Sequence, residues 1–181
     1  MAKARLEDLY VEKIRPQLKE MLKVKNIMEV PKLSKIVLNV GVKEAVGDSR
    51  VLQGVSAILS DIAGQLPVVT KARKSIAGFK IREGMPIGVM VTLRGKKMYE
   101  FLDRLINVAL PQVRDFQGVT RRLDKRGNYN LGIKDWIIFP EVSFDSAQKF
   151  HGLNITINTN AVSDEHAFEL LKSFGMPFRQ L

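Results

Sequence analysis

The alternation that follows Leu33, over residues 35–40 in the run KIVLNV, constrains the fold more than any other feature of the chain. Successive side chains of a β-strand point to opposite faces. Ile36 and Leu38 therefore lie on one face, and Lys35 and Asn39 lie on the other. We predict a strand that buries its apolar face and leaves a partly polar face open to solvent.

A second alternating segment covers residues 87–94, where Val89 and Val91 face one way and Thr92 and Arg94 face the other. Further strands are predicted at residues 66–70, 129–133, 136–139 and 153–159. Apolar residues at helical spacing predict helices at residues 6–22, 51–62, 96–110 and 164–174.

The order of these elements predicts the fold class. Pro16 lies inside the first predicted helix and should kink or divide it, because proline lacks an N–H group. The strands are joined both by hairpin-length and by helical connections. We therefore predict a single α+β domain over residues 1–181, with an antiparallel sheet, helices packed on one of its faces, and a long basic loop projecting from it.

The charge of the chain points to a polyanionic partner. There are 29 Lys and Arg residues against 19 Asp and Glu residues, a formal net charge of +10. Such a surplus favours nucleic acid, because each neutralised phosphate releases a condensed counterion. The alternative is a soluble protein that is merely basic. Apolar residues make up 45% of the sequence, which is enough for a packed core.

Several classes of protein are disfavoured by what the sequence lacks. The chain has no cysteine, which excludes disulfides, thiol nucleophiles and thiolate metal sites. No apolar run approaches the roughly 20 residues that span a bilayer. The N-terminal run MAKARLEDLYVEK lacks the apolar stretch of a signal peptide. We expect a cytoplasmic protein with no membrane partner.

The nearest signal for an enzyme is the glycine-flanked turn at residues 41–49, between a predicted strand and a predicted helix. It is longer than a phosphate-binding loop, and Asp48 stands where such a loop needs lysine. His151 and His166 have no second metal ligand at helical or strand spacing, and no serine lies in a nucleophile-elbow context. We predict no catalytic residue, no bound metal and no cofactor.

Polar side chains on the open faces of the alternating strands form the first candidate site. Lys35 and Asn39 share a face of one strand, and Thr92 and Arg94 share a face of the other. Gln65 lies just before the next predicted strand. In one sheet, these residues would offer a cation, an amide, a hydroxyl and a guanidinium to RNA. The alternative is an ordinary solvated face, because polar outer faces are normal in antiparallel sheets.

The stretch TKARKSIAGFKIREGMPIG, residues 70–88, forms the second candidate site. Its single acid, Glu83, stands among five basic residues: Lys71, Arg73, Lys74, Lys80 and Arg82. Long loops inside compact domains are usually functional or disordered. We predict that residues 71–84 form a basic loop that is mobile in the free protein. Its cations would meet phosphates, while Ile76 and Phe79 rest against a sugar or a base.

Four runs of sequence, in matching order over nearly the whole chain, resemble the family of bacterial large-subunit ribosomal protein five, the 5S ribosomal RNA binder. These runs are VPKLSKIVLNVGVKEA, LSDIAGQLPVVTKARKSIAGFKIREGMPIG, RGNYNLGIKDWIIFPEV and FGMPF. One departure is RRLDKRGNY at residues 121–129, where family members usually show an aromatic-Asp-Gly run before RGNY. This loop is slightly shorter and more basic.

The resemblance implies a structural constituent of the large ribosomal subunit whose concave sheet face binds 5S rRNA in the central protuberance. The matching positions are Lys35, Asn39, Gln65 and Thr92, with Arg94 beside them. It also implies that the basic loop reaches the transfer RNA in the peptidyl site. The contacting residues would be Lys71, Arg73, Lys74, Ser75, Phe79, Lys80 and Arg82. A surface around residues 111–145 would bind a small-subunit head protein in an intersubunit bridge, and neighbouring large-subunit rRNA and proteins are further partners.

Two other functions stay open at this point. A free-standing RNA-binding regulator would use the same sheet face and loop, but it would not sediment with large subunits in near-stoichiometric amount. A small phosphotransfer enzyme built on residues 41–49 would bind a nucleotide in isolation.

Overall fold

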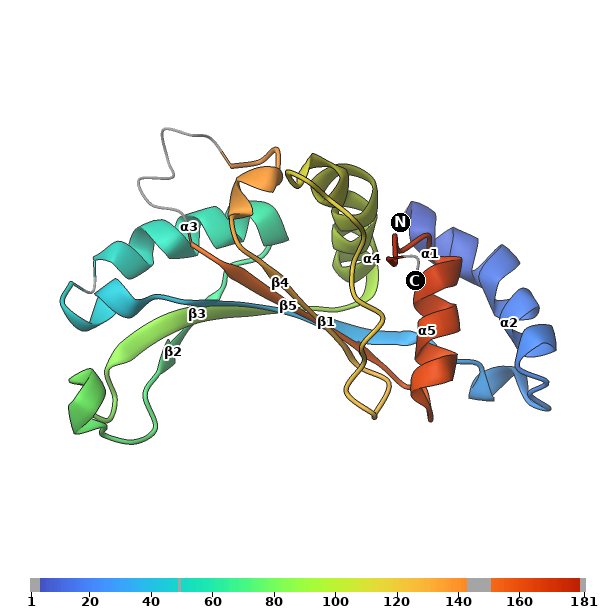
Figure 1. Cartoon of the computed structure of the whole chain (residues 1–181), viewed down its shortest axis with the longest axis horizontal. Coiled ribbons are helices and arrows are strands. Elements are labelled where there is room, and N and C mark those ends of the chain that lie inside the picture. Colours follow the sequence, from blue (N-terminus) through green and yellow to red (C-terminus); the bar gives the residue numbers. More distant parts are fainter. Residues whose placement is uncertain (1–3, 49, 143–150, 180–181) are drawn as a thin grey trace. The chain divides into compact units, whose positions relative to one another are not determined.

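The structure is built on a five-stranded antiparallel sheet with the strand order β2-β3-β1-β5-β4 (Figure 1). The computed structural model describes residues 4–48, 50–142 and 151–179. The strands are β1 (Leu33–Gly41), β2 (Val68–Lys71), β3 (Pro86–Leu93), β4 (Tyr129–Ile133) and β5 (Leu153–Thr159). Both alternating segments form strands as predicted. Ile36 and Leu38 on β1 are fully buried, for example.

The helices are α1 (Arg5–Leu9), α2 (Arg15–Met21), α3 (Val51–Ala63), α4 (Gly95–Arg104) and α5 (Asp164–Ser173). Pro16 divides the first predicted helix, as expected. A wider π-type turn, Tyr10–Ile14, separates α1 from α2, and Pro16 lies in the first turn of α2. Proline cannot donate a backbone hydrogen bond and its ring crowds the preceding turn, so a locally wider turn relieves the conflict.

Contacts between Cα atoms divide the described chain into two compact units. The first unit draws on residues 1–36, 94–131 and 156–181, and the second on residues 37–93 and 132–155. Strands β1, β4 and β5 contribute residues to both units. The α+β class and the antiparallel sheet are confirmed.

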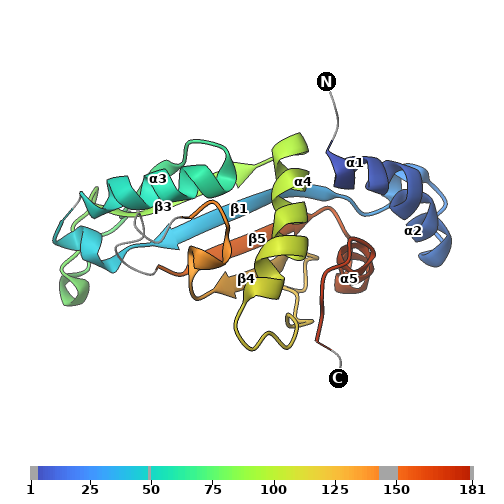
Figure 2. The same cartoon turned by 90° about the horizontal axis from the view of Figure 1, so that it is seen from above.

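In the second unit, α3 packs on β3 and β2 (Figure 2). Gly64 ends this helix in the left-handed conformation, with φ of 62°. The buried residues of α3 recur at helical spacing: Leu52, Val55, Ile58, Leu59, Ile62 and Ala63. On β3, Val89 and Val91 are buried, whereas Met90 is 37% exposed. One face of β3 is therefore packed, and the face that carries Met90 is open to solvent.

In the first unit, α1 packs against α4. The Nε of Arg5 donates a hydrogen bond to Oδ2 of Asp103 at 2.9 Å, and this bonding lowers the pKa of the Asp103 carboxyl. Phe174 stacks on Tyr10 and contacts Tyr99, with ring centroids 5.9 and 6.2 Å apart. Burial raises the pKa of Tyr99 to about 12. An aromatic cluster thus ties the end of α5 to the N-terminal helices.

The predicted strand at residues 136–139 is wrong. This segment forms a short 3-10 helix, Trp136–Ile138, and the Phe139 amide donates to the Trp136 carbonyl at 3.1 Å. Trp136 and Phe139 are each only 1% exposed. Side chains three residues apart eclipse each other on a 3-10 turn, so both rings reach the same side. The run WIIF has no alternation that could have distinguished this turn from a buried strand.

Candidate nucleic-acid interface

Three of the five predicted sheet residues lie together in the second unit. Asn39 on β1 and Thr92 on β3 are half-buried. The Val42 amide donates to the Ile87 carbonyl at 3.0 Å, and this hydrogen bond joins the chain segment of Asn39 to the chain segment of Thr92. Gln65, just after α3, donates from Nε2 to the Thr92 carbonyl at 3.4 Å. The amide of Gln65 is therefore already engaged with β3, whereas the Asn39 side chain stays available for a ligand.

Lys35 and Arg94 are placed differently from these three residues. Lys35 lies on the same side of β1 as Asn39, four residues earlier, and is half-buried. Arg94 follows β3, is exposed, and takes the N-cap position of α4 in extended conformation. Both residues belong to the first unit. The grouping of Asn39, Gln65 and Thr92 therefore does not include them.

Gly88 lies where β3 closely approaches both neighbouring strands, β1 and β2. It pairs with Thr70 on β2. A Cβ atom at position 88 would lie 2.7 Å from the Val40 carbonyl oxygen and 3.0 Å from Oγ1 of Thr70. Such distances leave room only for glycine, which is a recurrent reason for glycine inside a strand.

Val68 and Met90 add an apolar pair to the open face of the second unit. They are direct partners in the β2–β3 register and are 65% and 37% exposed. The alternation of β3 placed Met90 on the same face as Thr92, so the signal for Met90 was present in the sequence. Val68 lies in a strand that is too short for its sequence pattern to predict which side chains face the open side of the sheet. Apolar side chains beside polar ones suit contact with bases and sugars.

Residues 72–85 join β2 to β3 as a hydrogen-bonded hairpin, here called the basic hairpin. The Ala72 amide donates to the Met85 carbonyl at 2.8 Å, and the Gly84 amide donates to the Ala72 carbonyl at 3.0 Å. The register shifts between Thr70 and Lys71, just before the hairpin begins. The segment predicted as a long projecting loop is therefore a paired extension of two strands.

The end of the basic hairpin is also held by hydrogen bonds. Ile76 and Ile81 exchange two backbone hydrogen bonds of 2.9 and 3.1 Å around the short helical turn Ala77–Phe79. The Glu83 amide donates to Oγ of Ser75 at 3.0 Å. The family resemblance implied a ligand contact at Ser75, and the structure gives its hydroxyl a role in the shape of the hairpin. Periodicity could not reveal this pairing because the turn interrupts it.

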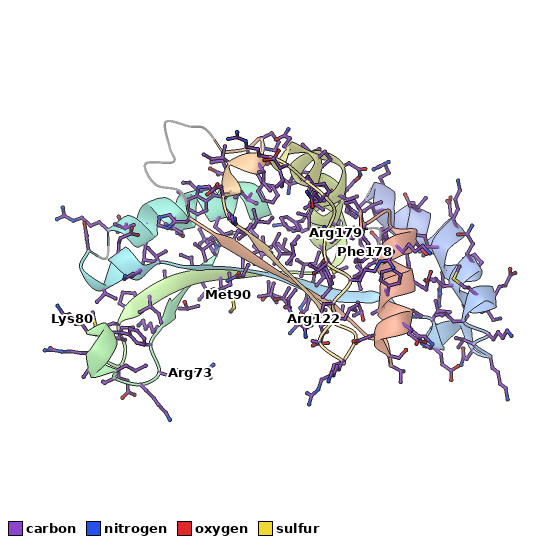
Figure 3. The ribbon with its side chains drawn as sticks, in the orientation of Figure 1. Arg73, Lys80, Met90, Arg122, Phe178 and Arg179 are labelled. Atoms are coloured by element: carbon purple, nitrogen blue, oxygen red, sulfur yellow. The ribbon has the colours of Figure 1, made fainter. Side chains whose placement is uncertain are left out.

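The basic side chains of the hairpin and of the residue before it, Lys71, face solvent. All five residues are exposed: Lys71, Arg73, Lys74, Lys80 and Arg82. None of the five has a carboxylate partner within the described residues. Phe79 is 71% exposed and Ile76 is 47% exposed. The side chains of Arg73 and Lys80 extend outward from the hairpin (Figure 3). Unpaired cations around an exposed ring give a surface suited to a polyanion with aromatic bases.

The region expected to hold a protein contact, residues 111–145, is divided between the two units. Its last residues, 143–145, lie outside the described residues. The ion pair between Arg114 and Asp115 is almost fully exposed, with 3.9 Å between Nε and Oδ2. The intersubunit contact stays a prediction.

Groups suited to catalysis or metal binding do not gather among the described residues. No cluster of three or more His, Cys, Asp or Glu residues occurs in that part of the chain. The His151 ring packs edge-on against Trp136 at 5.2 Å, and His166 lies in the first turn of α5. The glycine-flanked turn contains the 3-10 helix Lys43–Val46, and Ser49 lies outside the described residues. None of the described helices has the length and apolar character needed to cross a bilayer.

An open polar sheet face and unpaired cations on a hairpin are the features expected of a nucleic-acid-binding protein. Residues 26–82 match the family model for ribosomal protein L5, and residues 86–178 match the model for the C-terminus of the same ribosomal family. The chain belongs to the ribosomal protein L5 family.

Similar proteins carry the name large ribosomal subunit protein uL5. The one from Burkholderia multivorans is 58% identical over 177 residues, which cover 97% of this chain and 99% of that protein. Those from Ralstonia nicotianae and Psychrobacter cryohalolentis are 57% and 56% identical, over 97% of this chain and 98% and 99% of their own lengths. Membership confirms the resemblance, the expectation of a ribosomal protein that is not an enzyme, and its place in the cytoplasmic ribosome.

Proposed function

We propose that this chain, a structural constituent of the large ribosomal subunit, binds 5S rRNA in the central protuberance. The proposed contacts are Lys35, Asn39, Gln65, Thr92 and Arg94. The observation that carries this proposal is the open face of β1 and β3 in the second unit, where Asn39 and Thr92 stay half-exposed opposite the packed face. Neighbouring large-subunit rRNA and proteins are further partners.

The side chains of this face have the chemistry that RNA recognition needs. The Asn39 amide both donates and accepts hydrogen bonds, so it can bind a 2′-hydroxyl or a base edge, and the Thr92 hydroxyl can bind a phosphate oxygen. Val68 and Met90 supply apolar contact beside them. These neutral groups would set the position of the RNA, while the surplus positive charge of the chain supplies the long-range attraction.

We assign a second contact, with the transfer RNA in the peptidyl site, to the basic hairpin and its first flanking residue. The residues are Lys71, Arg73, Lys74, Ser75, Phe79, Lys80 and Arg82. The unpaired cations would meet phosphates, and the exposed Phe79 ring offers a stacking surface for a base. The hydrogen bonds within the hairpin support this assignment, because an ordered tip loses less conformational entropy on binding than a free loop does.

The whole chain, residues 1–181, would act as one rRNA-binding domain, and its surface within residues 111–145 would touch a protein of the small-subunit head. Family membership supports a ribosomal setting for both assignments.

Binding of purified 5S rRNA tests the proposal. Asn39→Ala and Thr92→Val remove no charge, and a lost hydrogen bond costs about 0.5–1.5 kcal/mol, or roughly two- to tenfold in Kd. We expect that loss with an unchanged salt dependence. Gln53→Ala is the matched control, because Gln53 is an exposed amide on α3, the helix that packs on the other face of the sheet. If both sheet variants bind like the control, the open face is not the RNA site.

A further inference from the structure

A short loop in the first unit carries a dense group of cations that belong to neither proposed RNA contact and lie within the range assigned to the bridge. Residues 119–127, here called the arginine loop, lead into β4. The Val119 amide donates to the Pro177 carbonyl at 2.8 Å, and the Arg179 amide donates to the Val119 carbonyl at 2.9 Å. The Tyr129 hydroxyl donates to the Thr120 carbonyl at 2.7 Å. The start of the loop is thus fixed to the C-terminal segment.

The acids nearest the arginine loop are held by its backbone. Asp124 accepts hydrogen bonds from the amides of Arg126 and Asn128 at 2.8 and 2.9 Å, and the Asn128 side chain lowers its pKa. Asp164, at the start of α5, accepts from the amides of Lys125 and Gly127 at 3.0 and 2.9 Å. Both carboxylates therefore shape the turn through amide groups rather than through the cationic side chains.

The cationic side chains of the loop fall into two groups. The Arg121 guanidinium lies 5.6 Å from the centre of the Phe168 ring, and its Nε donates to the Arg179 carbonyl at 3.1 Å. Arg122, Lys125 and Arg126 are exposed, and their side chains have no carboxylate partner within the described residues. Figure 3 shows Arg122 extending outward from the loop.

Two further acids among the described residues lie beside Arg121, in the first half of the loop. Glu165 and Glu169 line a groove together with Arg121 and Phe168. Arg121 is the cation of the loop that lies beside these two acids, and it is already held against the Phe168 ring. The three partnerless cations of the loop are absent from the lining of that groove. The surface available to an anion is therefore the one formed by these three side chains.

We propose that Arg122, Lys125 and Arg126 bind the phosphate backbone of large-subunit rRNA, as a contact separate from the open sheet face. This inference rests on the proposed function, since it needs the chain to lie against rRNA. Three cations on a turn fixed by backbone hydrogen bonds suit a ligand with closely repeated negative charges. Exposed ion pairs with a protein gain little in water, whereas phosphate contacts release condensed counterions. The bridge contact would then use the rest of residues 111–145.

Salt-induced release from large subunits provides the first measurement. The test variant is Arg122→Gln, Lys125→Gln, Arg126→Gln in the full chain, which keeps every backbone amide that Asp124 and Asp164 bind. The control variant removes the same charge from exposed positions of the N-terminal segment: Lys13→Gln, Lys23→Gln and Lys25→Gln. Each lost phosphate contact lowers the salt slope of binding by about 0.7–0.9. We expect the test variant to leave the subunit at clearly lower salt than the control.

Tethered hydroxyl-radical cleavage provides the second measurement. Because the chain has no cysteine, Arg126→Cys creates a unique attachment point for an iron chelate, and Lys25→Cys is the matched control. We expect strong cuts in rRNA from position 126 in assembled subunits. No cuts from position 126, or equal salt release of the two triple variants, overturns the inference. Failure of the unaltered protein to enter large subunits would instead contradict the proposed function.

Discussion

Replacing Gly88 by alanine tests how closely the strands of the second unit approach each other. The added Cβ would meet the Val40 carbonyl oxygen at 2.7 Å and Oγ1 of Thr70 at 3.0 Å. The Thr70 side chain can rotate away, but the Val40 carbonyl is part of β1 and cannot yield without moving the strand. We therefore expect Gly88→Ala to push β1 and β3 apart locally and to weaken the hydrogen bonds between them.

The size of the effect follows from the cost of overpacking, which is typically about 1–3 kcal/mol. Gly54→Ala is a matched control, because position 54 lies within α3 and an added Cβ there meets nothing within 4 Å. In a helix, alanine is more favourable than glycine by roughly 0.5–1 kcal/mol. The two substitutions should thus change the free energy of unfolding in opposite directions, and differ by about 1.5–4 kcal/mol.

Urea unfolding followed by circular dichroism measures this difference. With a slope near 2 kcal/mol/M, Gly88→Ala should lower the midpoint by roughly 0.5–1.5 M. Adding Thr70→Ala to Gly88→Ala should restore only part of the loss, because the closer contact with the Val40 oxygen stays. A Gly88→Ala protein as stable as the unaltered chain would show that β1 and β3 do not approach as described.

Two further predictions concern charge and pH. The first is a triple variant of the basic hairpin: Lys74→Gln, Lys80→Gln and Arg82→Gln. It should preserve 5S rRNA affinity and lower the occupancy of peptidyl-site transfer RNA on ribosomes, because these cations lie on the basic hairpin. A collapse of 5S affinity with occupancy spared contradicts the assignment. Burial raises the pKa of Tyr99 in the folded protein to about 12, above the pKa near 10 of a tyrosine in the unfolded chain. The buried neutral phenol therefore contributes its full stability below about pH 10, and this contribution is lost as pH rises towards 12. Urea unfolding between about pH 9 and 12 should therefore show a shallower decline for Tyr99→Phe than for the unaltered protein, and equal declines would refute this reasoning.

Much of the sheet could be predicted because its information is local. The alternation around Ile36 and Leu38 requires only that successive side chains point to opposite faces, and that rule holds before any tertiary contact forms. The end of α3 at Gly64 and the division of the first helix at Pro16 follow from backbone restrictions of single residues. The same locality placed Asn39 and Thr92 on open strand faces.

What sequence alone missed depends on contacts between distant segments. The pairing of Ile76 with Ile81 turns an apparent loop into a hairpin, and neither residue belongs to a regular periodic pattern. The exposure of Val68 is set by its register with Met90. Trp136 is buried on a helical turn, which its apolar neighbours could not distinguish from a strand. In each case tertiary context overrides a weak local preference.

The arginine loop shows a different limit. Its cations are visible in the sequence, but their availability depends on where the nearby acids point. Asp124 looks like a partner for Lys125 or Arg126 by proximity, yet its carboxylate accepts hydrogen bonds from backbone amides. Net charge alone cannot reveal which cations stay available for a ligand.

The register shift between Thr70 and Lys71 restricts how the basic hairpin can change in length. Side chains of a paired strand alternate with a period of two, so moving one arm by a single residue would exchange its inner and outer sides. The register shift at the base of the hairpin already displaces one arm against the other by such a step. A single-residue insertion between the base and the bonded pair of Ile76 and Ile81 would thus disturb the register of the hairpin, whereas an insertion within the turn Ala77–Phe79 leaves both bonded pairs in place.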